Sequence, residues 1–194
     1  MIPSKIDSNG RRGRRAAVAG MAACLALIAF PAGNASAGSG GISTDEGGSQ
    51  TTAGKDAKLR NGIAIAPRSA PARVKRAIEA ANEIAKGKDY CLGGGHARWR
   101  SRCYDCSGTV SYALGKYGSR QVDAPMPSGS YASYGRRGKG DWITWYADSD
   151  HMFVVIAGLR LDTSQTPGKG PGWSENVRAG FVNVSKSAAR HKGL

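Results

Sequence analysis

Two stretches of the chain have apolar residues at helical spacing, and a glycine follows each of them. The first pattern predicts a helix that ends at Gly87, in a folded domain that begins near Pro71. Its apolar face consists of Val74, Ala77, Ile78, Ala81, Ile84 and Ala85. The second pattern predicts a helix between Asp105, at the N-cap position, and Gly118. Its stripe, typical of a helix packed on a core, consists of Val110, Ala113, Leu114 and Tyr117.

The second half of the chain has the signals of strands rather than helices. Residues 124–140 are rich in Pro, Gly and Ser and have no periodicity, so we expect a loop there. Short runs rich in β-branched and aromatic residues predict strands at 142–147, 152–157, 159–162 and 181–184. A turn at Gly158 makes the second and third of these a hairpin. Two helices followed by antiparallel strands predict an α+β domain over residues 71–194.

The first 70 residues divide into two segments without a core pattern. Residues 1–15 are basic, 16–30 are apolar, and the small residues Ala35-Ser36-Ala37 follow. This order predicts a secretory signal peptide at 1–37, and therefore a secreted or cell-wall-associated protein. The apolar run is shorter than a membrane-spanning helix, so no stable membrane span is expected. Residues 38–70 are rich in Gly, Ser and Thr and predict a disordered spacer.

The chain is strongly basic, with 28 Lys and Arg against 14 Asp and Glu and a formal net charge of +14. A basic exported protein is attracted to polyanions, and anionic cell-wall polymers are the expected partners. Specific nucleic-acid binding is not expected, and the alternative is a charge that serves solubility alone. Arg98, Arg100 and Arg102, with Trp99 among them, form a local basic segment. We expect this segment to lie beside the functional cleft and to bind wall polymer.

Cys106 stands directly after the predicted N-cap Asp105, in the first turn of the second helix. Free backbone N–H groups and the positive end of the helix dipole favour the thiolate form of a cysteine at such a position. A cysteine placed there can serve as an activated nucleophile when a histidine reaches it. The alternative interpretation is that Cys106 is a small apolar residue that closes the end of a core helix.

One of the three histidines, His151, stands at the start of the second predicted strand. A strand edge is a rigid position from which an imidazole can reach a thiol, so His151 is the candidate base. If Ala157-Gly158 is a two-residue turn, Asp162 points to the same face as His151 and is displaced from it diagonally. Asp162 is therefore the candidate that orients the imidazole. Asp148 and Asp150, nearer in sequence, remain alternatives.

A glycine loop, Tyr90-x-x-Gly-Gly-Gly-His96, precedes the second helix and permits close approach of its backbone to that helix or to a ligand. Together with Asp105-Cys106-Ser107-Gly108 and the strand-borne His151, this loop resembles the NlpC family of papain-like cell-wall cysteine peptidases. The resemblance covers about residues 71–165. It implies a papain-like NlpC-type fold, with the nucleophile on a helix packed against an antiparallel sheet. It also implies hydrolysis of amide bonds in peptidoglycan stem peptides, often between D-glutamate and the diamino acid.

By position, the resemblance implies Cys106 as nucleophile, His151 as base and Asp162 as the orienting residue. It also implies that Tyr90 flanks the oxyanion site. The other candidate oxyanion or substrate contacts are Asp105, Ser107 and His96. This chemistry requires no metal or other cofactor. The chain departs from the family at Asp162, where many members have His, Asn or Gln, and at Cys91, where cysteine is unusual.

Other interpretations use the cysteines differently. Cys103-x-x-Cys106 at a helix start is the spacing of a thiol oxidoreductase, and zinc could be bound by Cys91, His96, Cys103 and Cys106. A further alternative is a wall-binding module without catalytic activity. With Cys24 in the predicted signal peptide, the exported chain has three cysteines, so one disulfide leaves one free thiol. If Cys106 is the nucleophile, the pair is Cys91–Cys103; the alternative pair, Cys103–Cys106, would consume the nucleophile.

Overall fold

The computed structural model describes residues 42–44, 50–164, 170–177 and 188–194, all of which belong to the unit Gly38–Leu194. The predicted signal peptide at 1–37 and the predicted strand at 181–184 lie outside the described residues. Within the described ranges, none of the helices has the length and apolar character needed to cross a membrane.

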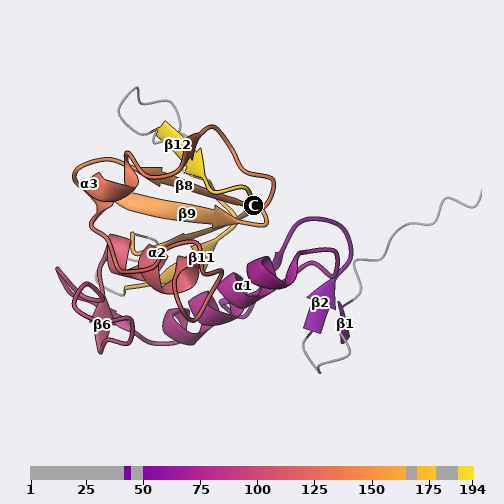
Figure 1. Cartoon of the computed structure of the whole chain (residues 1–194). Helices are drawn as coiled ribbons and strands as arrows, with labels where there is room; N and C mark the ends of the chain where they lie inside the picture. The colour runs from indigo at the N-terminus through magenta and orange to yellow at the C-terminus, as the bar shows by residue number, and fades with distance from the viewer. Residues whose placement is uncertain (1–41, 45–49, 165–169, 178–187) are drawn as a thin grey trace, which may run out of the picture. The chain divides into compact units, whose positions relative to one another are not determined.

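A six-stranded antiparallel sheet forms the centre of the fold (Figure 1). Its strand order is β11-β10-β9-β8-β12-β7, and every neighbouring pair is antiparallel. The strands are β7 (Arg136–Arg137), β8 (Ile143–Ala147), β9 (Met152–Ile156), β10 (Leu159–Asp162), β11 (Gly172–Ser174) and β12 (Ala188–His191). β8, β9 and β10 correspond closely to three predicted strands, because each has the β-branched or aromatic residues that suit a buried sheet.

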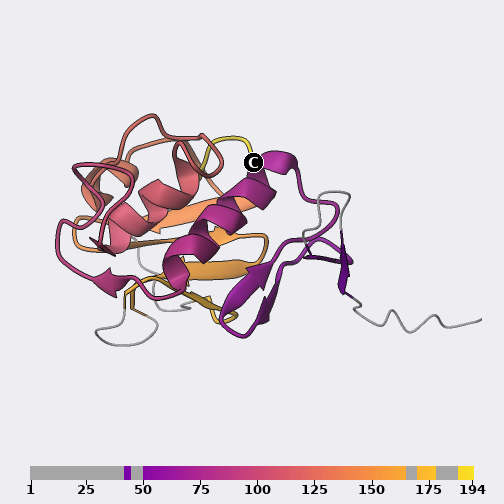
Figure 2. The same cartoon turned by 90° about the horizontal axis from the view of Figure 1, so that it is seen from below.

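Three helices accompany the sheet: α1 (Ala72–Ala85), α2 (Cys106–Leu114) and the short α3 (Ser128–Tyr131). α1 and α2 pack against each other and against β9, on one side of the sheet (Figures 1 and 2). Helices and sheet share one core, which includes Val74, Ile78, Val110, Leu114, Trp145, Met152, Val154 and Leu161. An antiparallel sheet with helices on one side confirms the predicted α+β class.

α2 differs from its prediction at the C-terminal end. It begins directly after its N-cap residue, as predicted, but it ends at Leu114 rather than near Gly118. The ring of Trp99 lies so close to Gly115 that a Cβ atom at this glycine would be 2.1 Å from it, and the helix stops there. Tyr117 therefore lies beyond the helix and is exposed. α2 is buried on all sides after its first residue, rather than along a single stripe.

The predicted disordered spacer is wrong for residues 50–70. This segment forms β2 (Gln50–Thr52), β3 (Lys58–Arg60) and β4 (Ile63–Ile65), and β1 (Ile42–Thr44) pairs with β2. It has few large apolar residues, but its alanines are buried in the core: Ala57, Ala64, Ala66 and Ala70. Asn82 of α1 accepts a hydrogen bond from the Ala64 N–H (3.0 Å) and donates one to the Ala64 carbonyl (2.9 Å). The buried alanines and the two hydrogen bonds to Asn82 hold the segment on the core and on α1, so the folded domain begins before Pro71.

The predicted loop at 124–140 contains α3 and β7. Tyr131 of α3 is fully buried against Trp145 of β8, with the ring centres 6.0 Å apart. The Trp145 indole N–H also donates a hydrogen bond to the Tyr131 carbonyl (3.2 Å). Aromatic packing thus orders a segment whose Pro, Gly and Ser content predicted none.

Candidate active site

The β9–β10 hairpin positions two of the candidate residues. Its turn consists of Ala157 and Gly158, which have φ angles of 47° and 84°, as the tight two-residue hairpin turn requires. The strands pair in the predicted register, so Asp162 lies diagonally from His151 on the same face. His151 Nε2 is 3.0 Å from Asp162 Oδ1. The predicted contact between imidazole and carboxylate is therefore present.

Asp162 is held as a buried carboxylate, with 0% of its side chain exposed. Ser164 donates to it twice, from the backbone N–H to Oδ1 (3.1 Å) and from the hydroxyl to Oδ2 (2.8 Å). Arg160 Nε lies 3.7 Å from Oδ2. Burial raises the pKa of Asp162, but the hydrogen bond and charge of His151, together with the two hydrogen bonds from Ser164, outweigh burial and hold this pKa below its ordinary value. Asp162 is therefore ionised at neutral pH and can orient His151.

Asp148, one of the alternative carboxylates, serves the backbone. Its Oδ1 atom accepts hydrogen bonds from the N–H groups of Asp150 (2.9 Å) and His151 (2.8 Å). The Asp148 N–H in turn donates to the His151 carbonyl (3.0 Å). Asp148 thus shapes the turn before β9, and Asp150 is exposed. The carboxylate that contacts the imidazole ring is that of Asp162.

Cys106 is a partly exposed free thiol at the start of α2. The helix start is capped by Asp105, whose Oδ1 accepts from the Gly108 N–H (2.7 Å). Burial lowers the pKa of His151, but side-chain hydrogen bonds to Asp162 and Cys106, and their charges, together raise it to about 9. Because His151 Nε2 is engaged by Asp162, Nδ1 is the ring nitrogen left for the thiol. Cys106, His151 and Asp162 therefore form one linked set.

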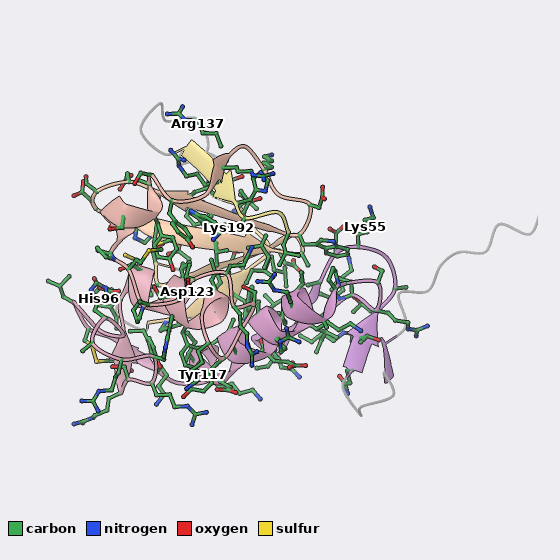
Figure 3. The ribbon with its side chains drawn as sticks, viewed as in Figure 1. Lys55, His96, Tyr117, Asp123, Arg137 and Lys192 are labelled. Atoms are coloured by element: carbon green, nitrogen blue, oxygen red, sulfur yellow. A yellow bond between two sulfur atoms is a disulfide. The ribbon has the colours of Figure 1, made fainter. Side chains whose placement is uncertain are left out.

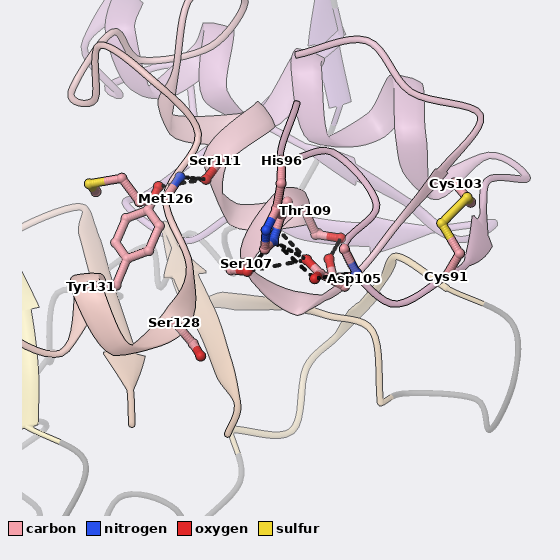
Figure 4. A network of polar contacts seen from close by, with 12 residues as sticks. Cys91, His96, Cys103, Asp105, Ser107, Thr109, Ser111, Met126, Ser128 and Tyr131 are labelled. Atoms are coloured by element: carbon pink, nitrogen blue, oxygen red, sulfur yellow. Dashed lines mark hydrogen bonds and ion pairs between the residues drawn. A yellow bond between two sulfur atoms is a disulfide. The ribbon is translucent and has the colours of Figure 1, made fainter. Parts of the chain in front are cut away.

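A second imidazole–carboxylate pair lies next to Cys106, at the start of α2 (Figure 4). His96 Nε2 is 2.9 Å from Asp105 Oδ2 and 2.8 Å from Ser107 Oγ. Asp105 and Ser107 are only 4% and 2% exposed, whereas 36% of the His96 side chain is exposed. Asp105 and Ser107 therefore support the helix start, and their role as oxyanion or substrate contacts stays a prediction. His96 is the member of this group that can reach a substrate.

The glycine loop packs directly on the start of α2. The Asp105 N–H donates to the Gly94 carbonyl (3.1 Å), and the Gly93 N–H donates to the Asp105 carboxylate (3.0 Å). A Cβ atom at Gly108 would lie 2.0 Å from the Gly94 carbonyl oxygen. The close approach of loop and helix, predicted from the three successive glycines, therefore also requires a glycine within the helix.

Cys91 and Cys103 form a disulfide with their Cα atoms 5.6 Å apart, which confirms the predicted pairing. The bond lies beside two short parallel strands, β5 (Asp89–Tyr90) and β6 (Cys103–Tyr104). A disulfide sulfur is not a thiolate. While this bond is intact, Cys103 cannot form a redox pair with Cys106, and Cys91 and Cys103 cannot serve as ligands in the four-residue zinc set. Across the part of the chain that the structure describes, no cluster of three or more His, Cys, Asp or Glu could hold a metal ion.

Tyr90, the candidate flank of the oxyanion site, is 44% exposed. Burial raises the pKa of its phenol, and the charges of Cys106 and Asp105 raise it further. The Tyr90 hydroxyl therefore keeps its proton at neutral pH and can donate a hydrogen bond near the thiol.

Arg160 and Ser164 belong to the site but were missed from the sequence. Arg160 lies two residues before Asp162 on β10, so strand alternation could have placed both on one face. Its guanidinium is also 5.7 Å from the centre of the Phe153 ring. Ser164 follows the strand, and no spacing rule links it to the carboxylate.

Comparison with known proteins adds no family assignment. No protein-family model matches the chain, and no curated protein matches it. The class of protein defined by fold and site is an α+β protein with a linked cysteine, histidine and aspartate. Its function is argued from those residues.

Proposed function

We propose that this protein is an exported cysteine peptidase of the papain-like NlpC type, which hydrolyses amide bonds in peptidoglycan stem peptides. The observation that carries the proposal is the linked set of Cys106, His151 and Asp162, in which the imidazole is hydrogen-bonded to both the thiol and a buried carboxylate. Such a set supplies a nucleophile, a base and an orienting group, which are the groups that thiol-dependent hydrolysis needs.

The first half-reaction begins when the Cys106 proton passes to His151, whose pKa of about 9 favours the imidazolium at neutral pH. The thiolate attacks the carbonyl carbon, a C–S bond forms, and the carbonyl π electrons move to oxygen. The backbone N–H of Cys106 and the hydroxyl of Tyr90 are the proposed donors to this oxyanion. When the oxyanion collapses, the C–N bond breaks and the imidazolium protonates the leaving amine.

The second half-reaction removes the acyl group from the sulfur. Neutral His151 takes a proton from water while the water oxygen attacks the thioester carbonyl. The C–S bond then breaks, and the imidazolium pairs with or protonates the departing Cys106 sulfur. Asp162 stays ionised throughout, and its charge stabilises the imidazolium that forms in each half-reaction.

Peptidoglycan is proposed as the substrate for three reasons. The glycine loop and the Asp-Cys-Ser-Gly motif resemble those of wall peptidases, the sequence predicts export, and the chain after residue 37, with 23 Lys and Arg against 13 Asp and Glu, suits an anionic wall. The exposed His96 and Tyr90, on the loop side of Cys106, are the candidate contacts to the stem peptide.

The test is to incubate the protein with purified sacculi and to identify released fragments by mass spectrometry. The wild-type chain should release stem-peptide fragments, and Cys106→Ala should release none while keeping the wild-type melting temperature. His151→Ala should lose as much activity, because the members of such a set act as a unit. His191→Ala, on β12, is the matched histidine control and should remain active.

Three outcomes would contradict the proposal. Release of stem-peptide fragments by Cys106→Ala would show that Cys106 is not the nucleophile. An inactive His96→Ala beside an active His151→Ala would mean that the other histidine is the base. Binding of the wild-type chain to sacculi without release of any fragment would favour a non-catalytic wall-binding module.

A further inference from the structure

Three arginines line one open groove on the protein surface. Arg98, Arg100 and Arg102 are exposed, and with Ser101 and Cys103 they surround about 520 Å³ of open space. We call this surface the arginine groove. In Figure 3, nitrogen-tipped side chains project into solvent around β6, below the labelled His96. All three arginines lie in the loop that the Cys91–Cys103 disulfide closes.

The backbone that carries the arginines is fixed at several points. The ring of Trp99 packs against Gly115 at the end of α2. The Tyr104 hydroxyl donates to the Trp99 carbonyl (2.9 Å) and accepts from the Ser101 N–H (2.9 Å). The disulfide joins the ends of the loop. A preorganised loop presents its charges to a ligand with less loss of chain entropy than a mobile basic tail.

The positive charge of the groove exceeds the negative charge around it. Within the described part of the chain, the salt bridges involve His96, His151 and Arg160, and none involves the arginines of the groove. Glu83 lines a neighbouring pocket together with Arg100, and its Oε2 accepts from the Tyr112 hydroxyl (2.6 Å), so its single negative charge offsets only part of the charge of the three arginines. A surface with this excess of positive charge attracts anions.

We propose that the arginine groove binds a polyol phosphate polymer of the cell wall through its phosphodiester groups. A guanidinium offers two parallel N–H donors to a pair of phosphate oxygens, a geometry that an ammonium group lacks. Single-stranded nucleic acid carries the same phosphodiester, but its binding sites also stack bases on aromatic rings. The residues that line the groove include no aromatic side chain, and the Arg100 guanidinium lies over the neighbouring exposed Tyr117 ring, 4.7 Å from its centre. The groove therefore suits a polymer that is recognised by its phosphates alone.

The groove and the candidate active site share one loop. The disulfide loop carries His96, which contacts Ser107 at the start of α2, and it also carries the arginines. A wall polymer bound in the groove would hold the active site near the stem peptides of the same wall. The inference is independent of catalysis, because it is tested as binding by a chain that cannot hydrolyse its substrate.

Binding to purified poly(glycerol phosphate) is measured by isothermal titration calorimetry, with the full exported chain carrying Cys106→Ala. The groove variant R98Q/R100Q/R102Q should bind at least about tenfold more weakly at about 0.1 M NaCl. Each phosphate contact adds roughly 0.7 to the slope of log K against log salt, so losing three contacts should reduce the slope by about two. The charge-preserving variant R98K/R100K/R102K should lose part of the affinity, because it keeps charge but not paired donors.

The control variant R136Q/R137Q/K139Q loses the same charge from exposed residues in and after β7. Figure 3 shows Arg137 at the opposite end of the molecule from Tyr117, whose ring is 4.7 Å from the Arg100 guanidinium. The control should bind within about twofold of the parent, and circular dichroism should show both variants folded. If the groove triple variant unfolds, the single variants R98Q and R102Q replace it.

Several outcomes would overturn the inference. Equal weakening in the groove and control variants would mean that total charge, and not the groove, drives binding. Equally tight binding of polyglutamate at matched charge would mean that phosphate is not recognised. Tighter, groove-dependent binding of single-stranded DNA would identify a nucleic-acid site instead. If the wild-type chain hydrolyses sacculi but does not bind the polymer, the proposed binding in the arginine groove is wrong and the proposed peptidase activity stands.

Discussion

Replacement of Asp162 by Asn removes one charge from the candidate active site and keeps the size of the side chain. The Oδ1 atom can still accept hydrogen bonds from His151 Nε2 and from the Ser164 N–H. The new amide nitrogen takes the place of Oδ2, where the Ser164 hydroxyl can turn to accept its proton. Arg160 loses the carboxylate that lies 3.7 Å from its Nε atom. The variant therefore tests the charge of Asp162 more than its shape.

The pKa of His151 sets the expected size of the effect. The rise of this pKa from 6.5 to about 9 means that the site favours the imidazolium. That rise corresponds to about 3 kcal/mol. Burial alone lowers the pKa of His151, and Asp162 supplies the largest of the interactions that raise it, so the Asn variant should bring it toward 6.5 or below. At pH 7 the equilibrium that forms the thiolate–imidazolium pair would be weakened by up to roughly 300-fold, and kcat/KM should fall with it.

Two measurements separate the pKa from the rate. NMR titration follows the His151 ring in the wild-type and Asp162→Asn chains, and a pH profile of kcat/KM locates the alkaline limb. Because the pKa is raised, the imidazolium should persist until about pH 9 in the wild-type chain and only to a lower pH in the variant. Asp150→Asn is the matched control, since it removes an exposed charge next to His151. A variant whose His151 still titrates near 9, or a control with an equal shift, would refute the reasoning.

Three further predictions concern the frame of the site and its response to pH. Replacing Cys91 and Cys103 by Ser opens a loop with a sequence separation of 12 and should lower the free energy of unfolding by about 3 kcal/mol, measured in urea. Unchanged stability would contradict this. Gly108→Ala puts a Cβ atom 2.0 Å from a carbonyl oxygen of the glycine loop and should lower stability by about 1–3 kcal/mol and reduce activity. A fully active, fully stable variant would argue against close packing there. Because the pKa of Asp162 is lowered, its ionisation stabilises the fold above the ordinary pKa of 3.8, and this stability is lost as the pH falls. Because the pKa of His151 is raised, its protonation stabilises the fold below pH 6.5, and this stability is lost as the pH rises through about 9. Urea titrations across pH should show both limbs, and Asp162→Asn should flatten them.

The contact between His151 and Asp162 could be predicted from sequence because it depends on local rules. A two-residue turn at Ala157-Gly158 allows one tight register, and that register determines which side chains share a face of the hairpin. The N-cap position of Asp105 likewise follows from side-chain chemistry at a helix start, and it places Cys106 in the first turn.

Features that depend on packing between distant segments could not be predicted in this way. The alanines between 50 and 70 carry little hydrophobic signal, yet Asn82 of α1 fixes the backbone of Ala64. The end of α2 depends on the ring of Trp99, which approaches Gly115 from another loop. The sequence around Ala64 does not indicate Asn82, and the sequence around Gly115 does not indicate Trp99, because each contact joins segments that are separated along the chain.

The two imidazole–carboxylate pairs near Cys106 differ in what each carboxylate does. Asp105 accepts hydrogen bonds from the backbone N–H groups of Gly93 and Gly108, so its charge serves to hold the loop and cap α2. Its contact with His96 adds to that structural role. The carboxylate of Asp162 lies on the sheet, where its charge acts on His151 and raises the pKa of that ring. Because Asp162 caps no helix, a change in the protonation of His151 does not disturb the start of α2, which carries Cys106. This division supports the proposal that His151 is the base and that His96 contacts the substrate.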